Sequence, residues 1–173
     1  MSERQTIGAL LESARARLER LNPQAALRAQ ADGALLVDTR CDELRREEGV
    51  IPGSVHLPLS VLYWRLDPTS GSADPRFTDP ERQIILCCAH GYSSSMAAAT
   101  LRELGFDRAT DIVGGFEAWA AAGLPVTPWH PTHSGAAGRS AALGVRWCGA
   151  ERGPCLVTTP EPSHRRKGSS AVR

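Results

Sequence analysis

Hydrophobic residues follow two different spacings along this chain. Between residues 6 and 20 they recur at every third or fourth position, which predicts an amphipathic helix. Short continuous apolar runs predict buried strands, and these occupy residues 34–39, 54–59, 83–88 and 109–113. Because helical segments separate these runs, we expect an α/β fold, an open parallel sheet with helices on both faces.

The helices between the strands carry recognisable ends. Asn22 followed by Pro23 is typical of a helix start, since Asn caps the first turn and Pro fits its geometry. Two further helical segments, residues 94–104 and 116–122, each end at a glycine, the residue that most often follows a helix.

These patterns divide the chain into three parts. Residues 1–19 are the predicted N-terminal helical extension, and residues 20–127 carry the alternating strands and helices. Hydrophobic residues in the last segment, residues 128–173, follow no sustained spacing of either kind. The last segment is rich in Gly, Pro and Ser and is basic, so we expect a largely disordered tail.

Composition and charge exclude several classes of protein. The formal net charge of +1 gives no strong overall attraction to nucleic acid. No apolar run is long enough to span a bilayer, and the N-terminus lacks the features of a secretory signal. We therefore expect a cytoplasmic protein without nucleic-acid or membrane partners.

The cysteines favour chemistry or burial over disulfide formation. Their number is odd and their spacing matches no disulfide framework; they are Cys41, Cys87, Cys88, Cys148 and Cys155. The last two stand too far apart for the usual Cys-x-x-Cys half-site of zinc, so no metal is expected.

Cys88 occupies the position with the strongest chemical signal. It ends a predicted strand, and the loop after it leads into the next predicted helix. Sites in parallel sheets form at the carboxyl ends of strands, and backbone N–H groups of such a loop can stabilise an anion. We therefore expect a thiolate with a lowered pKa. Gly91 would give the loop its freedom. Ser93 or Ser94 would cap the helix, and their hydroxyls could also donate to an anion bound at the sulfur.

Four segments in order resemble one known family. They are "LLVDTR" at residues 35–40, "GVIPGSVHLPL" at 49–59, "CAHGYSS" at 88–94 and "DIVGGFEAWAAAGLPV" at 111–126. Together they resemble the rhodanese-like, single-domain sulfurtransferases over about residues 20–127. The resemblance implies the rhodanese-like open parallel sheet, preceded here by an N-terminal helix.

The resemblance also implies transfer of sulfane sulfur, with no metal or organic cofactor. The Cys88 thiolate would take the outer sulfur of a persulfide or thiosulfate donor and hold it as a persulfide. A thiol or cyanide would then remove that sulfur. A persulfide on a protein partner is also a candidate donor.

The predicted substrate-binding residues are those of the loop and one remote cation: Ala89, His90, Gly91, Tyr92, Ser93, Ser94 and Arg65. Many loops of the family carry Arg or Lys beside the cysteine, whereas this loop carries neither, which favours a persulfide over thiosulfate. Asp38 and Arg40 are predicted to pair and support the strand end. Cys87 is predicted to be a small core residue.

Two other functions remain open. One is phosphatase or arsenate reductase chemistry, in which a similar loop needs one more residue and an arginine to hold an oxyanion. The other is a rhodanese-like module that binds a partner, or senses sulfur or redox state, without turnover.

Overall fold

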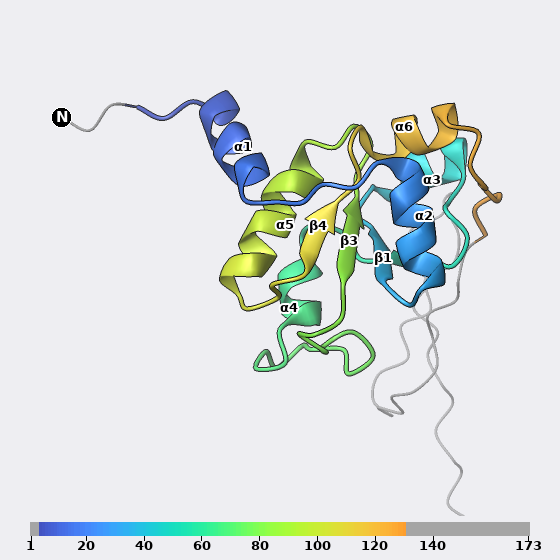
Figure 1. Ribbon diagram of the computed structural model, residues 1–173. Coiled ribbons are helices and arrows are strands. Elements are labelled where there is room, and N and C mark those ends of the chain that lie inside the picture. Colours follow the sequence, from blue (N-terminus) through green and yellow to red (C-terminus); the bar gives the residue numbers. More distant parts are fainter. Residues whose placement is uncertain (1–3, 131–173) are drawn as a thin grey trace, which may run out of the picture. The chain divides into compact units, whose positions relative to one another are not determined.

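The computed structural model describes residues 4–130, which contain a four-stranded parallel sheet (Figure 1). Its strands are β1 (Leu35–Asp38), β2 (Val55–His56), β3 (Ile84–Cys87) and β4 (Ala109–Asp111). Their spatial order is β2-β1-β3-β4, and Asp38 lies opposite Cys87 at the carboxyl edge of the central pair. The predicted parallel sheet is confirmed, whereas nearly all of the predicted tail, residues 128–173, lies outside the described residues.

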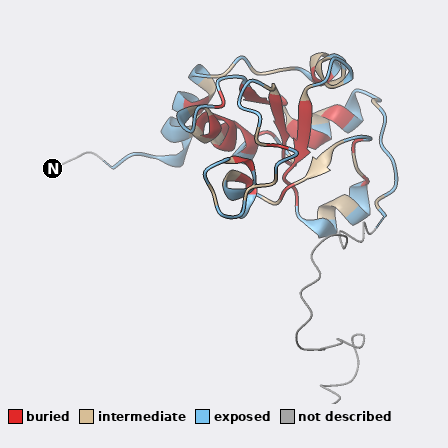
Figure 2. Cartoon of the chain, turned by 90° about the horizontal axis from the view of Figure 1, so that it is seen from below, coloured by how far each residue is buried: buried red, intermediate tan, exposed pale blue. Residues whose placement is uncertain are grey.

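Helices cover both faces of this sheet. They are α1 (Ile7–Ala16), α2 (Pro23–Ala31), α3 (Asp42–Glu48), α4 (Leu62–Leu66), α5 (Ser93–Glu103) and α6 (Gly115–Ala121). One face packs on α4 and α5, and the other packs on α2 and α6 around Phe116 and Trp119. Figure 2 shows β1, β3 and β4 buried between these layers in red, whereas β2 is half-buried. No helix within residues 4–130 is long and apolar enough to cross a membrane.

Side chains cap the starts of two helices. The Thr6 hydroxyl accepts a hydrogen bond from the N–H of Ala9 at 3.2 Å at the start of α1. At the start of α2, the Asn22 side chain accepts one from Ala25 at 2.8 Å, and Pro23 takes the first helical position. These contacts satisfy N–H groups that a helix end leaves unpaired, and the predicted Asn-Pro start is confirmed.

Several elements differ from the predictions. Helices α3 and α4 were not predicted. None of the seven residues of α3 is buried, and α4 has only five residues, so neither shows the repeated apolar spacing that predicts a helix. Strand β2 is shorter than predicted, because it pairs with β1 over only two residues. Helix α5 begins without a side-chain cap, so the predicted capping by Ser93 or Ser94 is wrong. Ser94 lies against the sulfur of Cys88, where its hydroxyl can take the other role predicted for it.

The segment between α1 and α2 runs along β4. The Leu21 N–H donates to the Asp111 carbonyl at 3.0 Å, and the Val113 N–H donates to the Leu21 carbonyl at 2.9 Å. Figure 1 shows this blue segment crossing beside β4 and α5 on its way to α2. The backbone pairing places Arg20, the residue before Leu21, beside the carboxyl end of β4.

Candidate active site

Cys88 directly follows β3 at the carboxyl edge of the sheet. β3 is a run of four buried residues, and residues 89–92 turn the chain from it into α5. Cys88 is 7% exposed, so the residue is largely shielded from bulk water. The thiol thus lies where the strand end and the helix start meet, as the sequence predicts.

Groups of the loop and of the first turn of α5 surround the Cys88 sulfur with hydrogen bonds. The Gly91 N–H donates to Sγ at 3.1 Å, and the Ser94 Oγ lies 3.1 Å from the same atom. Burial by itself raises the pKa of a thiol. Hydrogen bonds from Ser93, Ser94 and the backbone outweigh that effect, so the pKa of Cys88 lies below its ordinary value. A larger fraction of this thiol is therefore ionised than in a free cysteine, which favours nucleophilic attack.

The loop packs against the turn between β4 and α6 with no room for side chains. The Cys88 carbonyl accepts a hydrogen bond from the Phe116 N–H at 2.8 Å. A Cβ on Gly115 would overlap that carbonyl oxygen, and a Cβ on Gly91 would lie 2.9 Å from the Gly114 nitrogen. Gly91 also has a φ of +73°, which side-chain-bearing residues rarely adopt. The backbones of the loop and of this turn therefore pack directly against each other.

The other loop side chains turn away from the sulfur. The imidazole Nε2 of His90 lies 3.7 Å from a Glu117 carboxylate oxygen, and both side chains are exposed. Tyr92 is also exposed, with the Arg15 guanidinium 5.4 Å from its ring centre. Ala89 and His90 line a hollow of about 300 Å³, whose other lining residues are Glu48, Phe116, Glu117 and Ala120. Within residues 4–130, no hydrogen bond joins the His90 or Tyr92 side chain to the sulfur.

Arg65 does not lie at this site. Figure 1 places α4 toward the opposite end of the sheet from the loop that enters α5. The Arg65 guanidinium donates to the Ser72 carbonyl at 3.1 Å. Leu62 and Leu66 anchor α4 in the core, which leaves Arg65 at the surface. This placement does not support the predicted remote anion contact.

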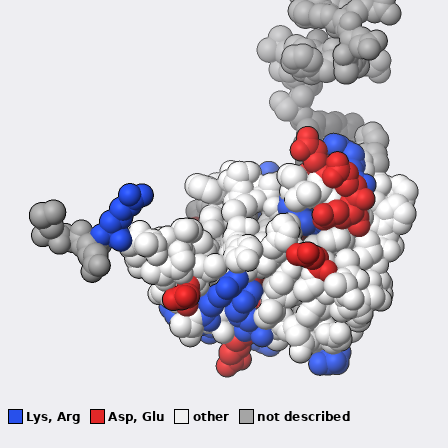
Figure 3. Space-filling model, turned by 90° about the horizontal axis from the view of Figure 1, so that it is seen from above, with Lys and Arg blue, Asp and Glu red and all other residues white. Residues whose placement is uncertain are grey.

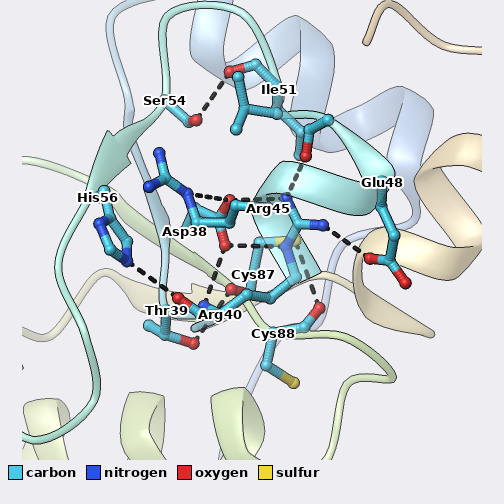
Figure 4. Close-up of polar contacts among 12 residues, drawn as sticks. Asp38, Thr39, Arg40, Arg45, Glu48, Ile51, Ser54, His56, Cys87 and Cys88 are labelled. Atoms are coloured by element: carbon cyan, nitrogen blue, oxygen red, sulfur yellow. Dashed lines mark hydrogen bonds and ion pairs between the residues drawn. The ribbon is translucent and has the colours of Figure 1, made fainter. Parts of the chain in front are cut away.

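Asp38 and Arg40 form a buried ion pair behind the loop (Figure 4). Arg40 Nη2 and Nε lie 2.7 and 3.0 Å from the two carboxylate oxygens of Asp38. The same guanidinium donates to Glu48 at 2.9 Å and lies 3.5 Å from the ring centre of Phe116. The predicted pair is present, and it joins the end of β1 to α3 and α6.

Cys87 is a core residue on the other face of the sheet. Successive strand residues point to opposite faces, and Cys87 is fully buried among Leu36 and Ile85. Burial, together with the charge of Asp38, raises the pKa of the Cys87 thiol well above its ordinary value. The predicted core position is confirmed.

Three charged residues near the loop were not predicted from the sequence. Asp111 is fully buried at the end of β4, and its carboxylate accepts a hydrogen bond from the Ser94 hydroxyl at 3.0 Å. Arg20 pairs with it at 2.7 Å, and Arg15 donates to a loop carbonyl at 2.8 Å. An isolated carboxylate inside an apolar run is the sequence signal for Asp111, whereas no local pattern links the two arginines to the loop.

The end of the protein that carries the loop has mixed charge. Figure 3, which looks down on this end, shows separate groups of basic and acidic side chains with no single wide positive surface. Within residues 4–130 no cluster of His, Cys, Asp or Glu could hold a metal ion. The arrangement is suited to chemistry at a single buried, hydrogen-bonded thiolate.

Comparison with known proteins gives consistent matches. A family model described as a rhodanese-like domain matches residues 22–122. The thiosulfate sulfurtransferase GlpE of Pseudomonas entomophila is 37% identical over 101 residues, which span 58% of this chain and 84% of GlpE.

Two solved structures are also similar. RPA3614 of Rhodopseudomonas palustris, described as a protein of unknown function and possible tyrosine phosphatase, shares 31% identity. It has a TM-score of 0.67 over 73% of this chain and 98% of its own. The polysulfide-sulfur transferase of Wolinella succinogenes shares 25% identity, with a TM-score of 0.56 over 72% of this chain and 89% of its own.

Proposed function

Because this chain belongs to the rhodanese-like domain family and is a sulfurtransferase of that family, we propose that it carries sulfane sulfur as a persulfide on Cys88. The observation that carries the proposal is the pair of 3.1 Å contacts to Sγ, from the Gly91 N–H and the Ser94 hydroxyl. Donors in these positions stabilise negative charge on sulfur before and after the transfer. Residues 20–127 would form the catalytic domain, with residues 1–19 as an extension.

The proposed reaction has two displacement steps. The Cys88 thiolate attacks the outer sulfur of the donor, a sulfur–sulfur bond forms, and the donor's own sulfur–sulfur bond breaks. With thiosulfate the leaving group is sulfite, and with a low-molecular-weight persulfide it is the parent thiolate. Cyanide or a thiolate then attacks the outer sulfur and regenerates the Cys88 thiolate, so that thiocyanate or a new persulfide leaves.

The choice of donor depends on charge near the sulfur. GlpE relatives are named for thiosulfate, a dianion, so thiosulfate is one donor to test. Residues 89–94 contain no Lys or Arg, and Arg15 and Arg20 donate to the Gly91 carbonyl instead of to the sulfur. The reacting group of a persulfide carries one negative charge, whereas thiosulfate carries two, so a persulfide donor suits this loop better than thiosulfate. A persulfide carried on a protein partner would fit the same requirement.

Phosphatase chemistry receives less support. RPA3614 is described as a possible tyrosine phosphatase, and its fold is similar. Phosphoryl transfer spreads charge over several oxygens and depends on charged donors such as arginine around them. Residues 89–94 provide backbone, hydroxyl and imidazole donors but no arginine, which suits a single sulfur anion better than a phosphate.

Mass spectrometry of intact peptides tests the proposal directly. The reduced protein and the Cys88→Ser variant are treated separately with thiosulfate and with glutathione persulfide, and then with cyanide. We expect one added sulfur atom on Cys88 of the unaltered chain, lost as thiocyanate, with faster loading from the persulfide. A folded protein that gains no sulfur on Cys88 from either donor contradicts the proposed function. Turnover of p-nitrophenyl phosphate would favour the phosphatase alternative.

A further inference from the structure

A chain of buried polar contacts leads from the Cys88 sulfur to Arg20. The Ser94 Oγ lies 3.1 Å from Sγ and 3.0 Å from Asp111 Oδ2. The Asp111 carboxylate binds Arg20 through two contacts, Nε to Oδ1 at 2.7 Å and Nη2 to Oδ2 at 2.9 Å. Asp111 is fully buried, and the Arg20 side chain is 15% exposed. The charge of this carboxylate is therefore poorly screened by water.

Ser94 has one hydroxyl hydrogen and two acceptors within reach. When Cys88 is a thiol, its S–H can donate to Ser94 Oγ while the hydroxyl donates to Asp111. When the sulfur is anionic it has no hydrogen to give, and it needs the hydroxyl as a donor. The hydroxyl must then turn from the carboxylate to the sulfur. How readily it turns depends on how well the carboxylate is satisfied without it.

Arg20 supplies two hydrogen bonds and the opposite charge to the Asp111 carboxylate. Besides Ser94, Asp111 Oδ2 accepts from the Ser95 hydroxyl at 2.8 Å, but Ser95 Oγ also lies 3.0 Å from the Gly91 carbonyl. Without the arginine, a buried and uncompensated carboxylate would hold both hydroxyls and would repel an anionic sulfur on the far side of Ser94.

We propose that Arg20 is a positioning residue for the sulfur-transfer reaction: by compensating Asp111, it releases the Ser94 hydroxyl to donate to the anionic sulfur of Cys88. This inference rests on the proposed role of Cys88. It also assigns a task to a residue that precedes the segment matched by the family model, which begins at residue 22.

The backbone around Arg20 is held in place for this task. Leu21 pairs with Ile112, the residue directly after β4, and the Glu19 carbonyl accepts a hydrogen bond from the Thr110 hydroxyl at 2.8 Å. Arg20 Nη2 also donates to the Gly91 carbonyl at 3.2 Å, so one guanidinium contacts both the carboxylate and the loop.

The test is the pH dependence of Cys88 alkylation by iodoacetamide, followed on the Cys88 peptide by mass spectrometry. In Arg20→Gln we expect the midpoint to move to higher pH and alkylation below it to slow by about tenfold, because the thiolate is opposed by the carboxylate. In the double variant Arg20→Gln with Asp111→Asn, which removes both charges, we expect the midpoint to return toward that of the unaltered chain.

A matched control comes from the same segment. Arg17 pairs with Glu103 at the surface, with more than half of each side chain exposed, so Arg17→Gln should leave the midpoint in place. The other charged groups around the loop stay the same in every variant. They are Arg15 on α1, His90 in the loop, Glu117 on α6, and the Asp38–Arg40 pair beyond β3. Differences between variants therefore report on Arg20 and Asp111.

Two results would overturn the inference. One is an unmoved midpoint in folded Arg20→Gln, and the other is a raised midpoint that the double variant fails to restore. If Arg20→Gln does not fold, Asp111→Asn alone remains decisive, because losing the carboxylate while keeping the arginine must lower the midpoint. Alkylation needs no sulfur donor, so these outcomes stay separate from the sulfur-loading test of the proposed function.

Discussion

Gly115 supports the Cys88 loop in a way that a single methyl group should disrupt. It begins α6 with a φ of +63°, and a Cβ there would overlap the Cys88 carbonyl oxygen. The same Cβ would lie 2.7 Å from the Gly91 nitrogen and 2.8 Å from the Ala89 carbonyl carbon. These are backbone atoms, which cannot rotate away. Gly115→Ala should therefore push the loop out of place.

Gly123 provides a matched control at the other end of α6. Its φ is +67°, and nothing lies within 4 Å of a Cβ built on it. Alanine at either position meets the left-handed backbone penalty of about 1–2 kcal/mol. Only Gly115→Ala adds overpacking, for which about 1–3 kcal/mol is typical. We therefore expect Gly115→Ala to lower the free energy of unfolding by about 1–3 kcal/mol more than Gly123→Ala.

In Gly115→Ala, the rate of sulfur loading on Cys88 should fall by more than the difference in stability suggests. The Gly91 nitrogen that the new methyl group would displace is the one that donates to Sγ at 3.1 Å. Hydrogen bonds to charged groups are worth about 1.5–3 kcal/mol, which corresponds to roughly ten- to a hundredfold slower sulfur loading.

Urea unfolding, followed by tryptophan fluorescence to which buried Trp119 contributes, measures the stabilities, and mass spectrometry of the Cys88 peptide measures loading. If Gly115→Ala matched Gly123→Ala in both stability and loading rate, the tight packing of the loop on α6 would not be what holds the site together.

Three further predictions concern single side chains. Ser94→Ala should shift the acid limb of sulfur loading to higher pH and slow loading about tenfold near neutral pH, because an anionic sulfur loses one of its donors; an unchanged pH profile would contradict this. The sign follows from the lowered pKa of Cys88, since loading fails as the pH falls through that pKa. Arg40→Met should destabilise the fold by about 3–5 kcal/mol, as it leaves Asp38 buried without its partner, and a loss below about 1 kcal/mol in urea unfolding would refute this. Cys87→Ala should cost about 1 kcal/mol of stability and leave sulfur loading of Cys88 intact, so a variant that folds but cannot be loaded would give Cys87 a chemical role.

Local patterns were sufficient for the elements on which the site depends. The buried run that ends at Cys88, the following loop and the alanine-rich helix lie close together in the chain. Apolar runs separated by helices specify a parallel sheet, and its strands end at one edge. The sequence alone therefore identifies Cys88 as the candidate nucleophile.

Elements whose stability comes from tertiary contacts were harder to predict. Helix α3 buries no residue. It is held by ion pairs that join its Glu48 to Arg40 and its Arg45 to Asp38. Ser93 and Ser94 fit the composition of a helix cap, yet Ser94 contacts Cys88 and Asp111 instead, because a buried thiol and carboxylate need its hydroxyl more than a solvated helix end does.

The electrostatic surroundings of the thiol belong to the tertiary structure alone. Arg20 and Asp111 stand 91 residues apart in the chain, and only the pairing of Leu21 along β4 brings them together behind Ser94. Helix and strand propensity and the spacing of apolar residues are local properties of a few residues. A buried charge, in contrast, is balanced by a partner that the tertiary structure places beside it. The chain's local order thus specifies the nucleophile and its loop, and the packed fold specifies the charges that surround them.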